Sequence, residues 1–133
     1  MANTTFSGPV RSQNGFQSVT VNATTGAVTV NSSFGTDAVL GTQSLSGAGA
    51  VDITNAFTQL TTTGAAQALT LADGTVGEIK IISHVVDGGS AVLTPTTKIG
   101  FTTITFTAVG DSAMLVYTSA GWDIVALNGA VAA

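Results

Sequence analysis

The chain has 133 residues, of which 44% are apolar, 8% are charged and 6% are aromatic. Three basic residues against seven acidic ones give a formal net charge of -4, which is too little positive charge for a surface that follows nucleic-acid phosphates. The absence of Cys excludes a disulfide framework, a thiolate nucleophile and a zinc site built on Cys. The length indicates one domain, or one domain with an extended arm.

The low content of charged residues is unusual, because a soluble domain is typically about 25% charged. The chain is rich in Thr, Val, Ala and Gly and poor in Lys and Glu, which favours strands over helices. No uncharged apolar run approaches the roughly 20 residues that a membrane-spanning helix needs, and the first residues lack the pattern of a secretory signal. We therefore expect a soluble β protein that hides much of its surface against copies of itself or a partner.

Residues 1–16 are predicted to form an extended N-terminal arm. Pro9 disfavours the helical conformation in the residue before it. Phe6, Val10 and Phe16 are isolated apolar residues in polar surroundings. Such residues can anchor an arm in pockets on a neighbouring molecule, or they can dock on the chain's own domain, and the sequence favours neither alternative.

Residues 17–49 are predicted to be a β-hairpin followed by a Gly- and Ser-rich connector. Apolar and polar residues alternate over 17–22 and again over 27–31, and a short Gly-containing turn separates the two segments. The segment 31–49 is small, polar and rich in Gly, which is typical of a loop.

Residues 50–133 are predicted to form the main β domain, because short alternating segments are separated by turn signals throughout. The expected strands lie at 50–54, 57–63, 67–71, 78–86, 91–94, 102–109, 113–118 and 122–127. No window shows sustained helical periodicity with caps. The expected fold is all-β, a small antiparallel sandwich or barrel with an extended N-terminal arm.

The segment 102–109 is the clearest strand in the sequence. Thr103, Thr105 and Thr107 are predicted to share one face, with Phe106 on the other. A polar face without charges avoids the cost of burying ions, so we expect these Thr residues at a contact between subunits. The alternative, a plain solvent face, would more usually include Lys and Glu.

Two groups of residues are candidates for a ligand site. Trp122 and Tyr117 could stack a sugar ring, although a single Trp in a terminal hairpin more often anchors the core or an interface. His84 and Asp87 could act as a base or hold a metal, but a structural histidine is favoured because no further ligands or nucleophile follow by spacing. The sequence contains no calcium loop, phosphate-binding loop or nucleophile elbow. We expect no enzymatic activity, no metal and no cofactor.

Two stretches resemble virion proteins of tailed phages, including phages that infect cyanobacteria. The N-terminal segment 6–16 is similar to the start of small virion proteins, and the segment 60–71, together with the closing Gly121 and Trp122, resembles a β module of capsid decoration (cement) and head-fibre-like proteins. The resemblance implies a homotrimer on the capsid exterior that binds the major capsid protein and clamps neighbouring capsid subunits, with a terminal arm making the contact.

On this basis, the expected function is that of a structural virion protein that binds and stabilises an assembled phage capsid. The capsid-contact arm is predicted to use Phe6, Pro9, Val10, Arg11 and Phe16. The predicted trimer or core anchors are Thr103, Thr105, Phe106, Tyr117 and Trp122. The alternative is a receptor- or glycan-binding module of a head or tail fibre, with Trp122 and Tyr117 at its site. Neither function involves nucleic acid or a membrane as a partner.

Overall fold

The computed structural model describes residues 16–34 and 40–133, in two compact units divided between Val39 and Leu40. In the first unit, β1 (Phe16–Val21) pairs antiparallel with β2 (Val28–Phe34). The side-chain Oδ1 of Asn22 accepts hydrogen bonds from the N–H groups of Thr24 and Thr25 and so closes the turn. The predicted hairpin is therefore present, and its second strand continues beyond the expected end at residue 31.

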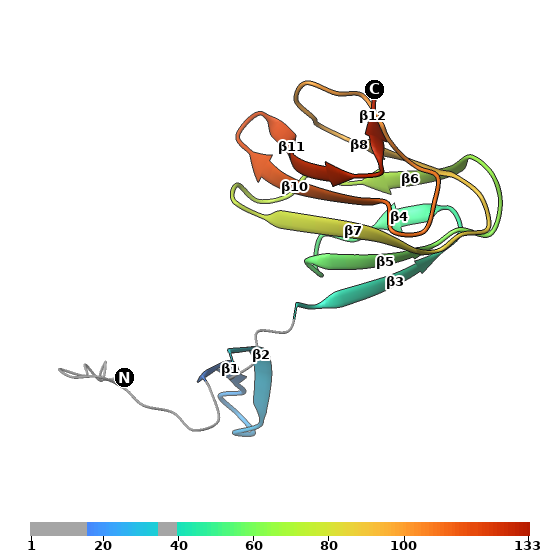
Figure 1. Ribbon diagram of the computed structural model, residues 1–133. Coiled ribbons are helices and arrows are strands. Elements are labelled where there is room, and N and C mark those ends of the chain that lie inside the picture. The colour runs from blue at the N-terminus through green and yellow to red at the C-terminus, as the bar shows by residue number, and fades with distance from the viewer. Residues whose placement is uncertain (1–15, 35–39) are drawn as a thin grey trace. The chain divides into compact units, whose positions relative to one another are not determined.

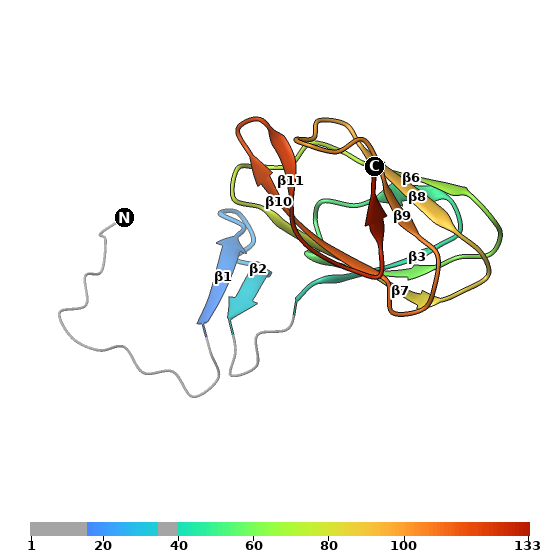
Figure 2. The same cartoon turned by 45° about the horizontal axis from the view of Figure 1, so that its top comes forward.

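The second unit contains ten strands in two five-stranded sheets, which lie as two layers (Figures 1 and 2). The strands are β3 (Thr42–Ser46), β4 (Gly49–Val51), β5 (Phe57–Thr61), β6 (Gln67–Leu71), β7 (Ile79–Val86), β8 (Ala91–Pro95), β9 (Ile104–Phe106), β10 (Ser112–Thr118), β11 (Gly121–Asn128) and β12 (Val131–Ala132). Sheet I has the order β11-β10-β7-β5-β3, and sheet II has the order β12-β9-β8-β6-β4. The described residues contain no helix, so the prediction of an all-β sandwich is confirmed.

The expectation of a purely antiparallel fold is wrong for half of the sandwich. From β3 to β8 the chain alternates between the sheets, and each strand lies parallel to the strand two places earlier. Residues 42–95 therefore wind as three stacked coils, in the manner of a short β-solenoid. The first coil contains β3 and β4, the second β5 and β6, and the third β7 and β8. The remaining strands, β9 to β12, close one side of both sheets with antiparallel pairs. Parallel pairing is possible here because each coil supplies the long crossover that it requires.

The structure also corrects several predicted boundaries. The predicted connector 31–49 contains the end of β2, all of β3 and the start of β4, and the compact unit begins at Leu40 rather than at residue 50. Its Ser and Gly residues form strands because β3 pairs with β5 and β4 pairs with β6. The predicted strand 102–109 is reduced to the three residues of β9. Pro95 ends β8, as expected from its missing N–H.

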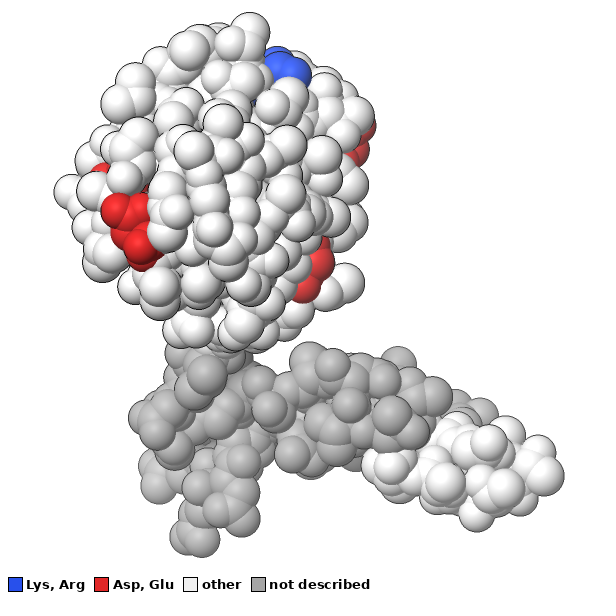
Figure 3. Space-filling view, turned by 90° about the vertical axis from the view of Figure 1, so that its right-hand side faces the viewer, with Lys and Arg blue, Asp and Glu red and all other residues white. Residues whose placement is uncertain are grey.

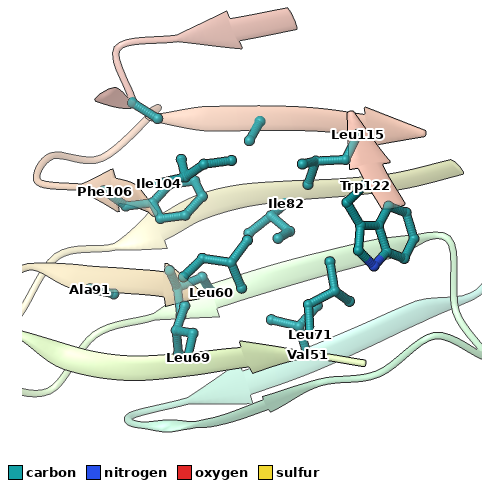
Figure 4. Close-up of a cluster of buried hydrophobic side chains, with 13 residues drawn as sticks. Val51, Leu60, Leu69, Leu71, Ile82, Ala91, Ile104, Phe106, Leu115 and Trp122 are labelled. Atoms are coloured by element: carbon teal, nitrogen blue, oxygen red, sulfur yellow. The ribbon is translucent and has the colours of Figure 1, made fainter. Parts of the chain in front are cut away.

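The core lies between the two sheets and is built from alternating residues of the strands (Figure 4). Leu60 of β5, Ile82 of β7 and Leu115 of β10 come from sheet I, while Leu69, Leu93 and Phe106 come from sheet II, and all are buried. Trp122 of β11 lies at one end of this cluster. Burying side chains of this size stabilises the fold by about 1.5–3 kcal/mol each relative to exposure.

Candidate functional site

No pocket is found in the part of the chain that the structure describes, and the same residues contain no group of three His, Asp or Glu side chains that could hold a metal ion. Nor does any helix in residues 16–34 and 40–133 have the length and apolar character needed to cross a bilayer. The candidate sites are therefore surfaces of the two sheets and clusters of polar side chains between them.

The outer faces of both sheets are almost free of charge. Among the ten strands of the second unit, three residues are Lys, Asp or His, and two of these, Lys80 and His84, face the interior. Asp123 of β11 is the one charged side chain on an outer face of these strands. The other acidic residues of the unit lie in loops and arcs between strands. Figure 3 shows one side of the unit as a largely uncharged surface with a few separate acidic groups and a basic group.

Sheet I carries larger apolar side chains on its outer face than sheet II. Phe57, Ile81 and Met114 are neighbours across β5, β7 and β10, and Ile79 lies beside Val116 in the next row. We call these five residues the outer strip. Four are half-buried and Ile79 is 44% exposed, although none faces the core. A contiguous apolar strip on a sheet face is typical of a surface that contacts another molecule.

The outer face of sheet II has a different character. Ala68, Val92, Thr105 and Val131 form one row across β6, β8, β9 and β12. These side chains are small and uncharged, and both ends of the row are exposed. The surface could approach another backbone closely, but it offers no large side chain as an anchor.

The inner face of β7 carries a fully buried lysine. Lys80 is 0% exposed, and its Nζ donates a hydrogen bond of 2.6 Å to the main-chain oxygen of Asn55. The same Nζ lies 3.6 Å from Oδ1 of Asp52. Burial lowers the pKa of Lys80, and the nearby carboxylates of Asp52 and Glu78 oppose this effect.

Asp52 is held from several sides in the arc between β4 and β5. Its Oδ1 accepts a hydrogen bond from the main-chain N–H of Asn55 at 2.9 Å, and its Oδ2 accepts one from Nδ2 of Asn55 at 3.0 Å. Partial burial would raise the pKa of Asp52, but the hydrogen bonds from Asn55 and the charge of Lys80 outweigh it and lower the pKa. The side chain of Gln43 links the same arc to β5, because its Oε1 accepts from Asp52 N–H and from the Thr58 hydroxyl.

The second buried polar cluster surrounds Thr62 and His84. The Thr62 hydroxyl donates to the main-chain oxygen of Gly89 at 2.7 Å and accepts from the N–H of Gly88 at 2.8 Å. Its contact of 2.9 Å with His84 must then be donated by Nε2–H of the ring, since the hydroxyl has a single hydrogen. The buried Nδ1 of His84 has no hydrogen-bond partner among the described residues. This cluster joins the second coil to the third.

The predicted arm lies largely outside the described residues. Phe6, Pro9, Val10 and Arg11 are not described, and Phe16 is the first residue of β1, opposite Phe34. The arm therefore remains a prediction.

The predicted anchors are spread over different environments. Phe106 is buried in the core, whereas Thr103 and Thr105 are half-buried, with Thr105 on the outer face of sheet II. Thr107 does not share that face, because β9 ends at Phe106. Its N–H and hydroxyl instead donate to Oδ2 of Asp111 in the following turn.

Trp122 is completely buried, so its ring offers no surface for stacking a sugar. Its Nε1–H donates to the main-chain oxygen of Ala72 at 2.8 Å, and the ring of Tyr117 packs edge-on with the centroids 5.1 Å apart. The arrangement is that of a core anchor. The alternative glycan site thus loses the residue on which it depended.

His84 and Asp87 have separate partners. Asp87 accepts a hydrogen bond from the N–H of Gly89 in its own turn, while the His84 ring contacts Thr62 inside the sandwich. Sequence reasoning identified His84 as structural but missed the outer strip and the cluster of Lys80 and Asp52. The available signal was the segment Ile79–Ile82, in which a single Lys interrupts a continuous apolar run.

A comparison with protein-family models finds no match, and a comparison with curated proteins finds no significantly similar sequence.

Proposed function

We propose that the protein is a structural virion protein that binds the outer surface of an assembled phage capsid and stabilises it. The resemblance of residues 6–16 and 60–71 to decoration and head-fibre-like proteins suggests this role. The observation that best supports it is the absence of charge from the strand faces, where Asp123 is the one exception. A chain that worked as a free monomer would be expected to carry Lys and Glu on these faces.

The working state in this proposal is a homotrimer whose subunits contact one another through the outer strip. Two copies that bury uncharged strips desolvate no ions, so the apolar contact is not opposed by a charge penalty. Asp123 lies beside Val116 at the β11 side of the strip, where it would be at the rim of the contact. Binding of such trimers to several capsid subunits at once would multiply weak contacts and favour the assembled shell.

The oligomer is tested with Ile81→Lys, which places a charge in the middle of the outer strip. The matched control is Thr94→Lys, at an exposed position on the outer face of sheet II. We expect wild type and Thr94→Lys to sediment as trimers in analytical ultracentrifugation, and Ile81→Lys to sediment as a monomer with an unchanged circular dichroism spectrum. A monomeric wild type, or a trimeric Ile81→Lys, would contradict the interface.

The location is tested by electron cryo-microscopy and protein quantification of the virus particle that contains this chain. A decoration protein is expected in hundreds of copies over the capsid, whereas a fibre module would be present in far fewer. Removal of residues 1–16 tests the arm separately. If the shortened protein binds capsids as tightly as the full chain, the arm is not the capsid contact.

A further inference from the structure

Three reactive groups of the second unit lie together where the arc between β4 and β5 meets the inner face of β7. The primary amine of Lys80 is 3.6 Å from Oδ1 of Asp52 and 2.6 Å from the main-chain oxygen of Asn55. The carboxamide of Asn55 in turn donates to Oδ2 of Asp52 at 3.0 Å. The carboxylate therefore contacts the amine through one oxygen and the carboxamide through the other.

Each group has the property that an amide exchange reaction requires. Burial shifts Lys80 toward its neutral, nucleophilic form, because the charged form is poorly solvated between the sheets. The Cγ of Asn55 is three covalent bonds from the main-chain carbonyl carbon whose oxygen accepts from Nζ, so the amine already contacts the residue that carries the carboxamide. Asp52 can accept a proton from the amine and deliver it to the leaving nitrogen.

We propose that Lys80 and Asn55 become joined by an isopeptide bond that the folded chain forms itself, with Asp52 as the proton relay. The lone pair of Nζ attacks Cγ of Asn55, and the Nζ–Cγ bond forms. The bond from Cγ to Nδ2 breaks, and Asp52 transfers a proton from Nζ to the departing nitrogen. The products are a secondary amide and one ammonia molecule, and Asp52 returns to its original form. No oxidant, metal or other reactant is required.

The cross-link would join β7 in the third coil to the arc that follows β4 in the first. This matters because β3 and β4 are edge strands, each hydrogen-bonded to a neighbouring strand on one side within the described sheets. A covalent tie across β5 would keep this end of the sandwich from separating under load. The inference is independent of the proposed function, because it depends only on groups inside one chain.

The test is the intact mass of the purified full-length protein. We expect wild type to be lighter than its sequence mass by one ammonia, while Lys80→Arg and Asp52→Asn have their full sequence masses. Lys98→Arg is the matched control, since Nζ of Lys98 contacts the main-chain oxygen of Pro95 instead, and it should still show the loss. Trypsin should also fail to cleave after Lys80 in the cross-linked chain, leaving one continuous fragment of residues 12–98 that contains an internal ring.

Loss of ammonia has one other source in this sequence, the formation of a cyclic imide at Asn-Gly pairs such as Asn128–Gly129. The fragment spectrum distinguishes the two, because only the isopeptide joins Lys80 to Asn55, and mild alkali hydrolyses only the imide, which opens to aspartate and isoaspartate. A wild-type mass equal to the sequence mass, or an ammonia loss that maps to Asn14 or Asn128, would overturn the proposal. Neither result depends on the folding of a variant.

Discussion

Thr62→Val removes a hydroxyl at the junction of the second and third coils while nearly preserving the side-chain volume. Thr62 is 2% exposed, and its hydroxyl has three close partners, the oxygen of Gly89, the N–H of Gly88 and the ring of His84, besides a longer contact of 3.4 Å to the oxygen of Val86. In the variant the fully buried ring of His84 loses this partner, whereas Gly88 is exposed and Gly89 half-buried, so water can replace part of what these two lose. A buried polar group without a partner costs about 1–3 kcal/mol.

The three costs are not additive, because Gly88 and Gly89 are adjacent in one loop and can shift together. We therefore expect Thr62→Val to lower the free energy of unfolding by about 2–4 kcal/mol, most of it from the buried contact with His84. Thr62→Ser is the matched control, since it keeps the hydroxyl and removes one methyl group. Its expected cost is about 1 kcal/mol.

The measurement is equilibrium unfolding in urea at one fixed protein concentration, because association of subunits would make the apparent stability concentration-dependent. The decisive quantity is the difference between the two variants rather than either value alone. If Thr62→Val is within about 1 kcal/mol of Thr62→Ser, the hydroxyl does not hold the two coils together and the reasoning is refuted.

Three further changes test other parts of the fold. Hydrogen bonds from the N–H groups of Thr107 and Ala108 lower the pKa of the Asp111 carboxyl group. The charged carboxylate therefore stabilises the folded protein above the ordinary pKa of 3.8. This stabilisation is lost as the pH falls through the lower pKa that the group has in the folded protein. In thermal unfolding at pH 7, Asp111→Asn should thus be less stable than wild type by about 1.5–3 kcal/mol, and this difference should begin to narrow as the pH falls below about 4. A difference that does not change with pH would refute the assignment. Gly89→Ala should lower the stability of the folded protein far more than Gly77→Ala. Both glycines have positive φ, but a Cβ added at Gly89 would lie 2.5 Å from the main chain of Gly64, whereas a Cβ added at Gly77 would meet no atom within 4 Å. Trp122→Phe should cost about 1–3 kcal/mol in the same assay because the oxygen of Ala72 loses its donor, and an unchanged midpoint would contradict this.

The parts of the fold that the sequence predicted well are those set by neighbouring residues. The strand over Gln67–Leu71 was predicted with its observed bounds, and the hairpin that joins β10 to β11 follows from the turn at Ser119 and Ala120. The first strand is marked by alternation of apolar and polar residues, whereas β10 is an almost continuous apolar run and its hairpin is marked by the short turn that ends in Gly121.

The parallel coils could not be predicted in the same way, because alternation shows that a residue is in a strand but not which strand is its neighbour. Leu60 aligns with His84, and Leu69 aligns with Leu93, so the second and third coils have the same length. The two coils share few residue types at matched positions, and the repeat is therefore weak in the sequence. β3 was missed because its Ser and Thr residues are typical of loops, and its pairing with β5 overrides that preference.

The outer strip was missed for a related reason. Apolar residues occupy both faces of β7, so the pattern around Ile79 to Ile82 does not indicate which face is buried. Lys80 faces inward because Asn55 and Asp52, which come from an arc earlier in the chain, supply its partners. Only the folded structure brings these groups together, and only then do Ile79 and Ile81 become surface residues.

The low charge of this chain has two separate physical origins. Between the coils, most side-chain connections are made by hydroxyl and amide groups, as at Thr62 and Gln43, and the contact of Lys80 with Asp52 is the one ion pair among the described residues. Such uncharged connections would be equally useful in a monomer, so they do not explain why the surface lacks charge. The uncharged outer faces have no such role in the fold, since Ile81 and Thr94 both face away from the core. Ile81→Lys and Thr94→Lys therefore separate the contribution of the surface to association from its contribution to the fold. If the outer strip serves association alone, only Ile81→Lys disrupts the oligomer. The coils of both variants should remain folded.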